Sequence, residues 1–394
     1  MTQEEKLLIK IQTLFYFAGS IAGIFLNLFL FQLGNFRAVV TFDVIALTLL
    51  VTMYVASGKL LKRFSSRTLI RLGFGFFILE NLMLFLLRER AIDFLVPLAI
   101  IAGLGHGCFW PGNNLSVYIL THTETRNSYL GKLNFWINIA LGLGPILGGS
   151  IIYVANIYSL KVNGYASLFL LVALIDIYLV ILASNLPRFS GVDFSYRHLL
   201  RHKRSWNWKT ILKENFLYGL WDVGFNAISG VLIYLIVTSE FTVGTIKTIT
   251  ALVFAVGSMW AGHVLQKNKF AFVYATIISS IGLLIFGLQQ NWLGIVSLVL
   301  ITNIFQPYLN ISVSKMFYDT IDKVKEPWQS KYHFLIERDF ALGVGRVMNY
   351  LILLQFFKPE NQIAIAKTWV LVIPILPLII GFLQWKLVSG KNTS

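Results

Sequence analysis

Long apolar stretches alternate with short polar segments along the whole of this 394-residue chain. A helix needs about 20 residues to cross the hydrocarbon core of a bilayer, and each stretch is close to that length. The expected spans are 10–33, 37–57, 69–87, 94–119, 130–157, 166–186, 212–238, 243–265, 271–288, 292–315, 335–357 and 365–388. The pattern therefore predicts an all-α polytopic membrane protein with twelve transmembrane helices.

Basic residues collect on alternate loops between these spans. When the loops are numbered so that both termini share one side, that side holds 25 of the 33 lysines and arginines, the other side holds 7, and Arg346 lies inside a span. The positive-inside rule places the basic side, with both termini, in the cytoplasm. The first ten residues carry acids and lead into a full-length span without a small-residue cleavage site, so we expect no cleaved signal peptide. We expect a plasma-membrane location, in the inner membrane of a bacterium.

Composition excludes several other classes of protein. Charged residues make up 13% of the chain, against about 25% in soluble domains. The net charge of +15 is spread over the inner loops, which fits anionic lipid headgroups better than nucleic acid. The single cysteine, Cys108, excludes disulfides and cysteine-built metal sites. No phosphate-binding loop or cluster with metal-ligand spacing is present in the sequence, so we expect no cofactor, no metal and no enzymatic activity.

The chain divides into two similar halves. A basic and aromatic linker at 188–211 separates six spans in 1–187 from six in 212–394, and it is either an amphipathic segment on the inner leaflet or a solvated connection. The fourth and tenth spans share an F-x-P-x-x-N pattern at an offset of 196, Asn27 and Asn226 are 199 apart, and Gly58 and Gly262 are 204 apart. Duplicated halves that rock around a shared midplane site give many secondary transporters alternating access.

Two motifs carry a resemblance to a known family. The loop after the second span reads GKLLKRFSSR from Gly58 to Arg67 and resembles the G-x-L-x-D-R-x-G-R-R loop of the major facilitator superfamily, with matches that include Arg63. The fifth span contains GPILGG, with Gly144, Pro145, Gly148 and Gly149 matching the G-P-x-x-G-G core of drug/proton antiporters in that superfamily. Small residues let helices approach closely and proline removes a backbone donor, so a packing seam without bearing on transport direction is the alternative.

The resemblance implies the superfamily fold, a monomer, and a cavity lined by the first, fourth, seventh and tenth spans. The implied function is secondary active transport of a small organic solute, with proton-coupled export as the first choice. The fourth span lacks the embedded arginine expected in drug antiporters and reads GLGHG from Gly103 to Gly107, so the subfamily stays open. Proton-coupled uptake of a sugar or nucleoside is the second candidate, and a non-transporting receptor on the same fold is the third. A lipid-modifying enzyme would have to use His198 and His202 of the linker.

Polar residues inside apolar spans are costly in lipid, and they usually face a cavity or a partner. The candidates on the substrate and proton path, in the first, fourth, seventh and tenth spans, are Asn27, His106, Trp110, Asn113, Asn114, Asp222, Asn226, Gln306 and Asn310. The amides are equally expected to join helices to one another. Acids, amides and aromatic rings suit an amphipathic organic cation, and they also suit a sugar or nucleoside. Asp222, Asp43 and His106 are the titratable groups through which protons would couple to transport.

Arg346 lies in the middle of the eleventh span and requires a partner. The resemblance implies that the second and eleventh spans meet across the two halves. Asp43 would then pair with Arg346, or exchange partners with it as the halves rock. The alternative is a pair within one half, between Arg346 and Asp222. Glu80 and Asp176 lie in the third and sixth spans, which the resemblance places at the periphery.

Overall fold

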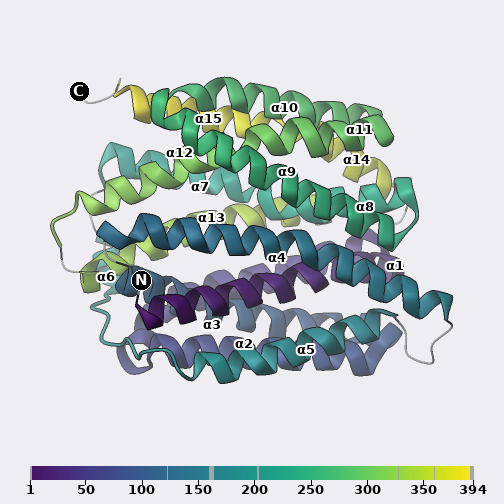
Figure 1. Cartoon of the computed structure of the whole chain (residues 1–394), viewed down its shortest axis with the longest axis horizontal. Coiled ribbons are helices and arrows are strands. Elements are labelled where there is room, and N and C mark those ends of the chain that lie inside the picture. Colours follow the sequence, from purple (N-terminus) through teal and green to yellow (C-terminus); the bar gives the residue numbers. More distant parts are fainter. Residues whose placement is uncertain are drawn as a thin grey trace.

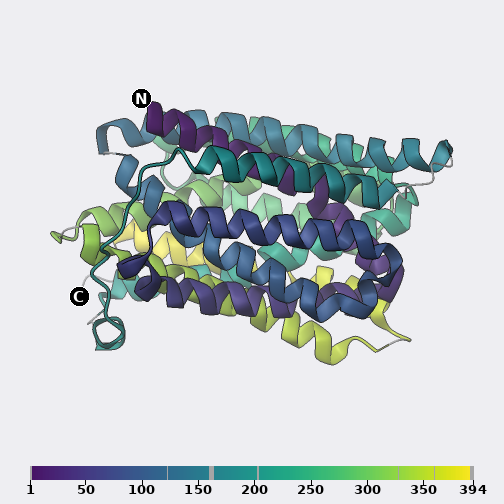
Figure 2. The same ribbon diagram turned by 90° about the horizontal axis from the view of Figure 1, so that it is seen from below.

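The structure, a computed structural model, describes residues 2–121, 123–158, 164–201, 204–326, 328–358 and 360–390. This described part consists of helices and connecting turns, without strands. The helices lie roughly parallel in one bundle, and both described ends of the chain lie at the same end of it, together with the short helix α6 (Tyr196–Arg201) (Figures 1 and 2).

The first half of the chain forms α1 (Gln3–Arg63), α2 (Ser66–Leu87), the 3-10 turn η1 (Arg88–Phe94), α3 (Leu95–Leu120), α4 (Thr123–Ile157) and α5 (Gly164–Ala183). A straight helix as long as α1 would measure about 90 Å. Instead the backbone leaves the helical conformation at Gly34 and Asn35, where Asn35 has a φ of 59°, so α1 contains both the first and the second span. The ψ of Asn35, −169°, takes the backbone out of both helical regions, which ends the first helical arm and starts the second.

The second half forms α7 (Trp206–Gly219), α8 (Asp222–Val237), α9 (Glu240–Lys267), α10 (Ala271–Gln289), α11 (Trp292–Ser297), the π-helical turn η2 (Leu298–Thr302), α12 (Asn303–Asp322), α13 (Trp328–Phe356), α14 (Gln362–Val372) and α15 (Ile375–Ser389). Three spans expected to be continuous are interrupted. The seventh breaks at Leu220 and Trp221, the tenth passes through η2, and the twelfth breaks at Pro374, which has no backbone donor to continue a helix.

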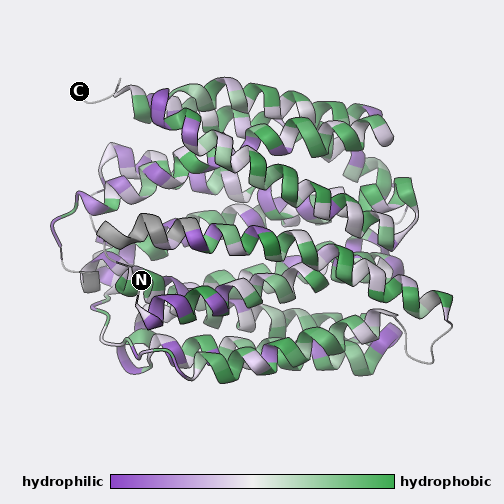
Figure 3. Cartoon of the chain, viewed as in Figure 1, coloured by the Kyte–Doolittle hydropathy of each residue, from purple (hydrophilic) through white to green (hydrophobic). Residues whose placement is uncertain are grey.

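Nine segments within the described residues are long and apolar enough to span a membrane. Two of them, Gln3–Arg63 and Ser66–Leu120, are long enough to cross twice. The charged helix α13 lies beside these segments in the bundle, so the arrangement is consistent with twelve crossings. Hydrophilic positions gather at the end of the bundle that holds the termini, while apolar positions cover the middle (Figure 3). This distribution defines a multi-pass membrane protein.

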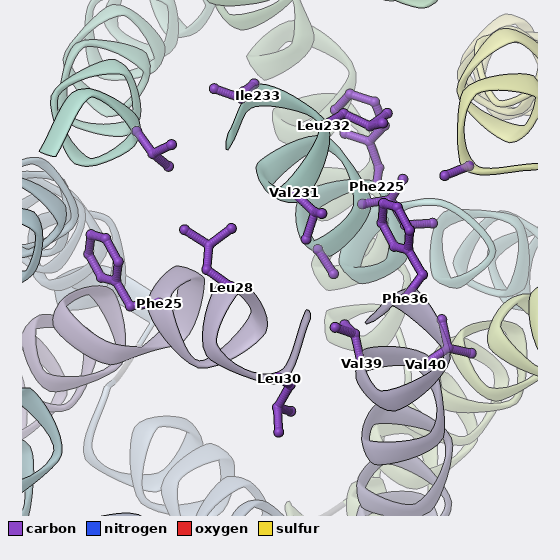
Figure 4. Packing of buried hydrophobic residues seen from close by; sticks show 14 of the residues in the cluster. Phe25, Leu28, Leu30, Phe36, Val39, Val40, Phe225, Val231, Leu232 and Ile233 are labelled. Atoms are coloured by element: carbon purple, nitrogen blue, oxygen red, sulfur yellow. The ribbon is translucent and has the colours of Figure 1, made fainter. Parts of the chain in front are cut away.

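The two halves meet mainly through α1 against α13, α4 against α9, and α1 against α8. Near the turn at Gly34, apolar side chains of α1 and α8 pack together, among them Leu28, Phe36 and Phe225 (Figure 4). At the end that holds the termini, a second cluster joins Tyr54 of α1 to Tyr332 of α13. The halves are therefore in contact at both ends of the bundle.

Candidate functional site

The break in the seventh span lies about midway along it, between α7 and α8. Asp222 is the first residue of α8, so its carboxylate lies at a helix N-terminus, where unpaired N–H groups and the helix dipole favour a negative charge. The break thus gives an acid at mid-membrane depth a local reason to be charged.

Arg346 of α13 binds this carboxylate directly. Its Nε lies 3.2 Å from both Asp222 oxygens, and its Nη2 lies 2.5 Å from Oδ2. The side chains are 22% and 11% exposed, so the pair is largely shielded from water. Arg346 therefore pairs with Asp222 within its own half of the chain. The structure does not show the alternative pair, between Arg346 and Asp43 of the other half. Asp43 instead lies beside Tyr350, one turn along α13 from Arg346.

Two glycines bring α7 and α13 close enough for this ion pair. A Cβ atom at Gly345 would overlap the carbonyl oxygen of Phe216, and one at Gly219 would overlap that of Leu342. Small residues at a crossing allow helix backbones to come into contact in a membrane. The position of Arg346, next to Gly345 in the chain, is therefore fixed by backbone packing.

Polar groups from both halves surround the ion pair. Tyr16 of α1 and His106 of α3 lie within range of the Arg346 charge, and Tyr218 lies between the pair and Asn310 of α12. Trp110 packs edge-on against Tyr16, with ring centroids 6.3 Å apart. Candidate residues of the fourth, seventh, tenth and eleventh spans thus lie around the ion pair, and their role in transport stays a prediction.

A few positions on α8 and α1 are not covered by other side chains. Asn226, one turn after Asp222, is exposed although its neighbours on α8 are mostly buried. On α1, a Cβ atom at Gly19 or Gly23 would meet no atom within 4 Å. These glycines share a helical face with Asn27 and with Tyr16, which lies within range of the Arg346 charge. Gln306 of α12 is half-buried, and no contact places it at the ion pair.

The two asparagines of the fourth span join helices. Gln12 of α1 donates to the Asn113 oxygen at 2.6 Å, and Tyr129 of α4 donates to Gln12 at 3.1 Å. Asn114 donates to the Tyr54 hydroxyl at 2.8 Å. In this arrangement Asn113 and Asn114 hold α1, α3 and α4 together. Joining helices is one of the two roles expected for these amides, and lining the substrate path is the other.

Other buried acids lie away from the centre. Asp176 of α5 accepts a hydrogen bond from Asn81 at 3.3 Å and lies close to Glu80 of α2, so this acidic pair is peripheral, as expected. Glu214 of α7 was not singled out from the sequence. Both of its oxygens are buried and, within the described part of the chain, have no hydrogen-bond partner.

The loop after the second span is held by the linker and by α5. The Phe194 ring lies where a Cβ atom at Gly58 would be, and Arg67 donates to the carbonyl oxygens of Ser184 at 2.8 Å and Leu186 at 3.2 Å. Arg63 is exposed. Because Phe194 is buried, this part of the linker packs on the bundle.

The end of the linker differs from the predicted boundary. The α7 helix begins at Trp206, six residues before the predicted span. His202 and the side chain of His198 lie outside the described residues.

The GPILGG segment lies at a seam of three helices. Gly144 and Gly148 pack against the backbone of α1 at Ile21, and Gly149 packs against Glu240 of α9. The carbonyl group of Pro145 fills the space beside Gly244 of α9. These glycines thus allow α4 to pack closely against α1 and α9, and their bearing on transport direction stays a prediction.

Substitution of Gly144 by alanine is expected to lower thermal stability and transport. The added Cβ atom would lie 2.9 Å from the Ile21 nitrogen and would also overlap the Ser20 side chain, and overpacking costs about 1–3 kcal/mol. Gly142→Ala is the matched control, because its Cβ meets only Leu252, at 3.6 Å. Melting curves of both purified variants check this; equal melting temperatures would contradict it.

Comparison with known proteins places this architecture in a family. The family model described as Major Facilitator Superfamily matches residues 8–326. A relative described as uncharacterized protein YqgE, from Bacillus subtilis (strain 168), is 22% identical over 354 residues, covering 87% of this chain and 80% of the relative.

Solved structures show the same fold. A bacterial homologue of the human drug peptide transporters PepT1 and PepT2 has a TM-score of 0.74 at 9% identity, covering 99% of this chain and 98% of that one. A D-xylose-proton symporter has a TM-score of 0.73 at 12% identity, covering 97% and 96%. The chain belongs to the major facilitator superfamily. It is a multi-pass membrane protein with the fold of a secondary transporter.

Proposed function

We propose that this protein is a proton-coupled secondary active transporter that moves a small organic solute by alternating access, with export by antiport as its direction. The observation that carries the proposal is the Asp222–Arg346 pair at the break in the seventh span. A carboxylate that loses its cationic partner in a low-dielectric site takes up a proton readily, and regains its charge when the cation returns. Rocking of the halves would make and break this pair.

The location and topology follow from the same proposal. The hydrophilic end of the bundle, with both termini and the linker, faces the cytoplasm of a plasma membrane, because it carries most of the basic residues. The halves 1–187 and 212–394 act as the two rocking units, joined by 188–211, and the protein works as a monomer.

Replacing the Asp222 carboxyl should abolish substrate-dependent proton exchange. Purified protein in weakly buffered detergent solution would receive organic cations, sugars, nucleosides, peptides and carboxylates in turn, with pH as the readout. Antiport predicts proton release when the substrate binds to wild type, and none with Asp222→Asn. Glu80→Gln removes a carboxyl at the periphery and should leave the release unchanged.

Two results would contradict this assignment. Equal release by wild type and Asp222→Asn would transfer the proton site to His106 or Asp43. Loss of release in Glu80→Gln alone would transfer it to the acidic pair between α2 and α5.

Uptake by proton symport is the second candidate, favoured by the fold shared with the D-xylose-proton symporter. The sign of the pH change separates the two candidates, because a symporter takes up protons when its substrate binds. In intact cells, the initial direction in which the solute moves after a pH gradient is imposed would separate the two candidates in the same way.

A further inference from the structure

Lys247 is a basic residue within the spanning helix α9. The Ser239 side chain caps this helix and Glu240 is its first residue, so Lys247 lies about 10 Å further along the helix axis. Its Cε atom lies 3.9 Å from the position of a Cβ atom at Gly230, which belongs to α8. The side chain therefore points toward α8 in the interior of the bundle, and it is only partly exposed.

Lys247 extends over the same face of α8 that begins at the ion pair. Asp222, Asn226 and Gly230 lie four residues apart in succession, so they share one face of the helix. A Cβ atom at Gly230 would overlap the Ile24 side chain of α1, and the Lys247 stem lies at ordinary contact distance beside it. Asn226 is exposed on this face, and Gly19 and Gly23 leave space open on α1. Lys247 therefore lies where α1, α8 and α9 meet.

The acidic side chains of this region already have other interaction partners. Asp222 is bound by Arg346, and Glu240 accepts hydrogen bonds from Gln32 at 2.9 Å and Tyr165 at 3.3 Å. Asp43 lies beside Tyr350 at the seam with α13. Among the residues that the structure describes, none forms an ion pair or hydrogen bond with Lys247. A cation in an apolar interior is costly unless an anion meets it.

We propose that Lys247 binds an anionic group of the transported solute, a carboxylate or a phosphate, with the Asn226 amide as a neighbouring hydrogen-bonding group. This inference rests on the proposed transporter function and narrows its substrate class, because the sequence alone favoured a cation, sugar or nucleoside. A Cβ atom at Gly19 or Gly23 of α1 would meet no atom within 4 Å, which leaves room along that helix for the body of the solute. An inside-negative membrane potential drives anions outward, which agrees with export.

The test determines whether the solutes that the protein transports are anionic, neutral or cationic. Proteoliposomes of the full chain would be loaded with a bacterial metabolite extract, given imposed pH and potential gradients, and analysed by mass spectrometry for solutes that leave or enter. Wild type should move anionic solutes. Lys247→Gln should reduce their rate at least tenfold, whereas Lys247→Arg, which keeps the charge, should retain most of it. Lys323→Gln, at an exposed position at the end of α12, is the control and should match wild type.

Each outcome has a distinct meaning. Movement of only neutral or cationic solutes by wild type would overturn the anion assignment and leave the transporter function intact. Equal anion transport by wild type and Lys247→Gln would remove Lys247 from the site. A Lys247→Gln protein with a lowered melting temperature and unchanged anion transport would give the lysine a purely structural role. If wild type moves no solute at all, the proposed function fails, and this inference fails with it.

Discussion

Arg346→Ala is expected to abolish transport, with a loss of more than ~100-fold, and to destabilise the protein. Removing one partner of a buried ion pair leaves the other as an uncompensated charge, at a cost of about 3–5 kcal/mol. Here that partner is Asp222, which is 11% exposed. Proteoliposome transport rates and melting curves measure the two effects separately.

The matched control is a variant that removes both charges. Asp222→Asn combined with Arg346→Gln leaves no unpaired charge, so its stability should return to within about 1 kcal/mol of wild type. Its proton-coupled transport should stay lost, because the carboxyl group that would carry the proton is absent. Restored transport in the double variant would show that the ion pair serves stability alone.

Gly345→Ala is expected to have the second largest effect, by separating α7 from α13. The new Cβ atom would overlap the Phe216 carbonyl oxygen, which belongs to the backbone and cannot rotate away. Overpacking of this kind costs about 1–3 kcal/mol. A shift of α13 also moves the adjacent Arg346 away from Asp222, so transport should fall along with the melting temperature.

Gly262→Ala provides the comparison for this prediction. Gly262 also lies within a spanning helix, and a Cβ atom there would meet nothing within 4 Å. Alanine has a higher helix propensity than glycine, so this variant should be as stable as wild type or slightly more so. If Gly345→Ala behaves like Gly262→Ala, the close packing of α7 and α13 is not what positions Arg346.

The overall fold could be predicted from the sequence because apolar length and the bias of basic residues report directly on the bilayer. The interruptions could not be predicted so well. The break before Asp222 contains no proline that would mark it. In the structure, close backbone contacts between α7 and α13 lie next to the break, and they join residues more than a hundred positions apart.

The sequence indicates candidate residues wherever a charged or polar side chain falls inside an apolar span. Asp222, Arg346 and His106 were found because each is a polar residue in an apolar span. The partner of Arg346 stayed open, since the sequence does not show which neighbouring acid faces it. Lys247 was missed because it was counted with the outer basic residues. The expected span 243–265 already contains Lys247, and Ser239 followed by Glu240 is a helix-start signal that places this lysine about two turns inside α9.

The sharp turn within α1 has a mechanical consequence. Only Gly34 and Asn35 separate the helix that carries the open face at Gly19 and Gly23 from the helix that packs against α13. So short a connection holds the adjacent ends of the two arms together, although it lets the angle between them change. We therefore expect a shift of the first arm at this end to reach the seam between the halves through the turn.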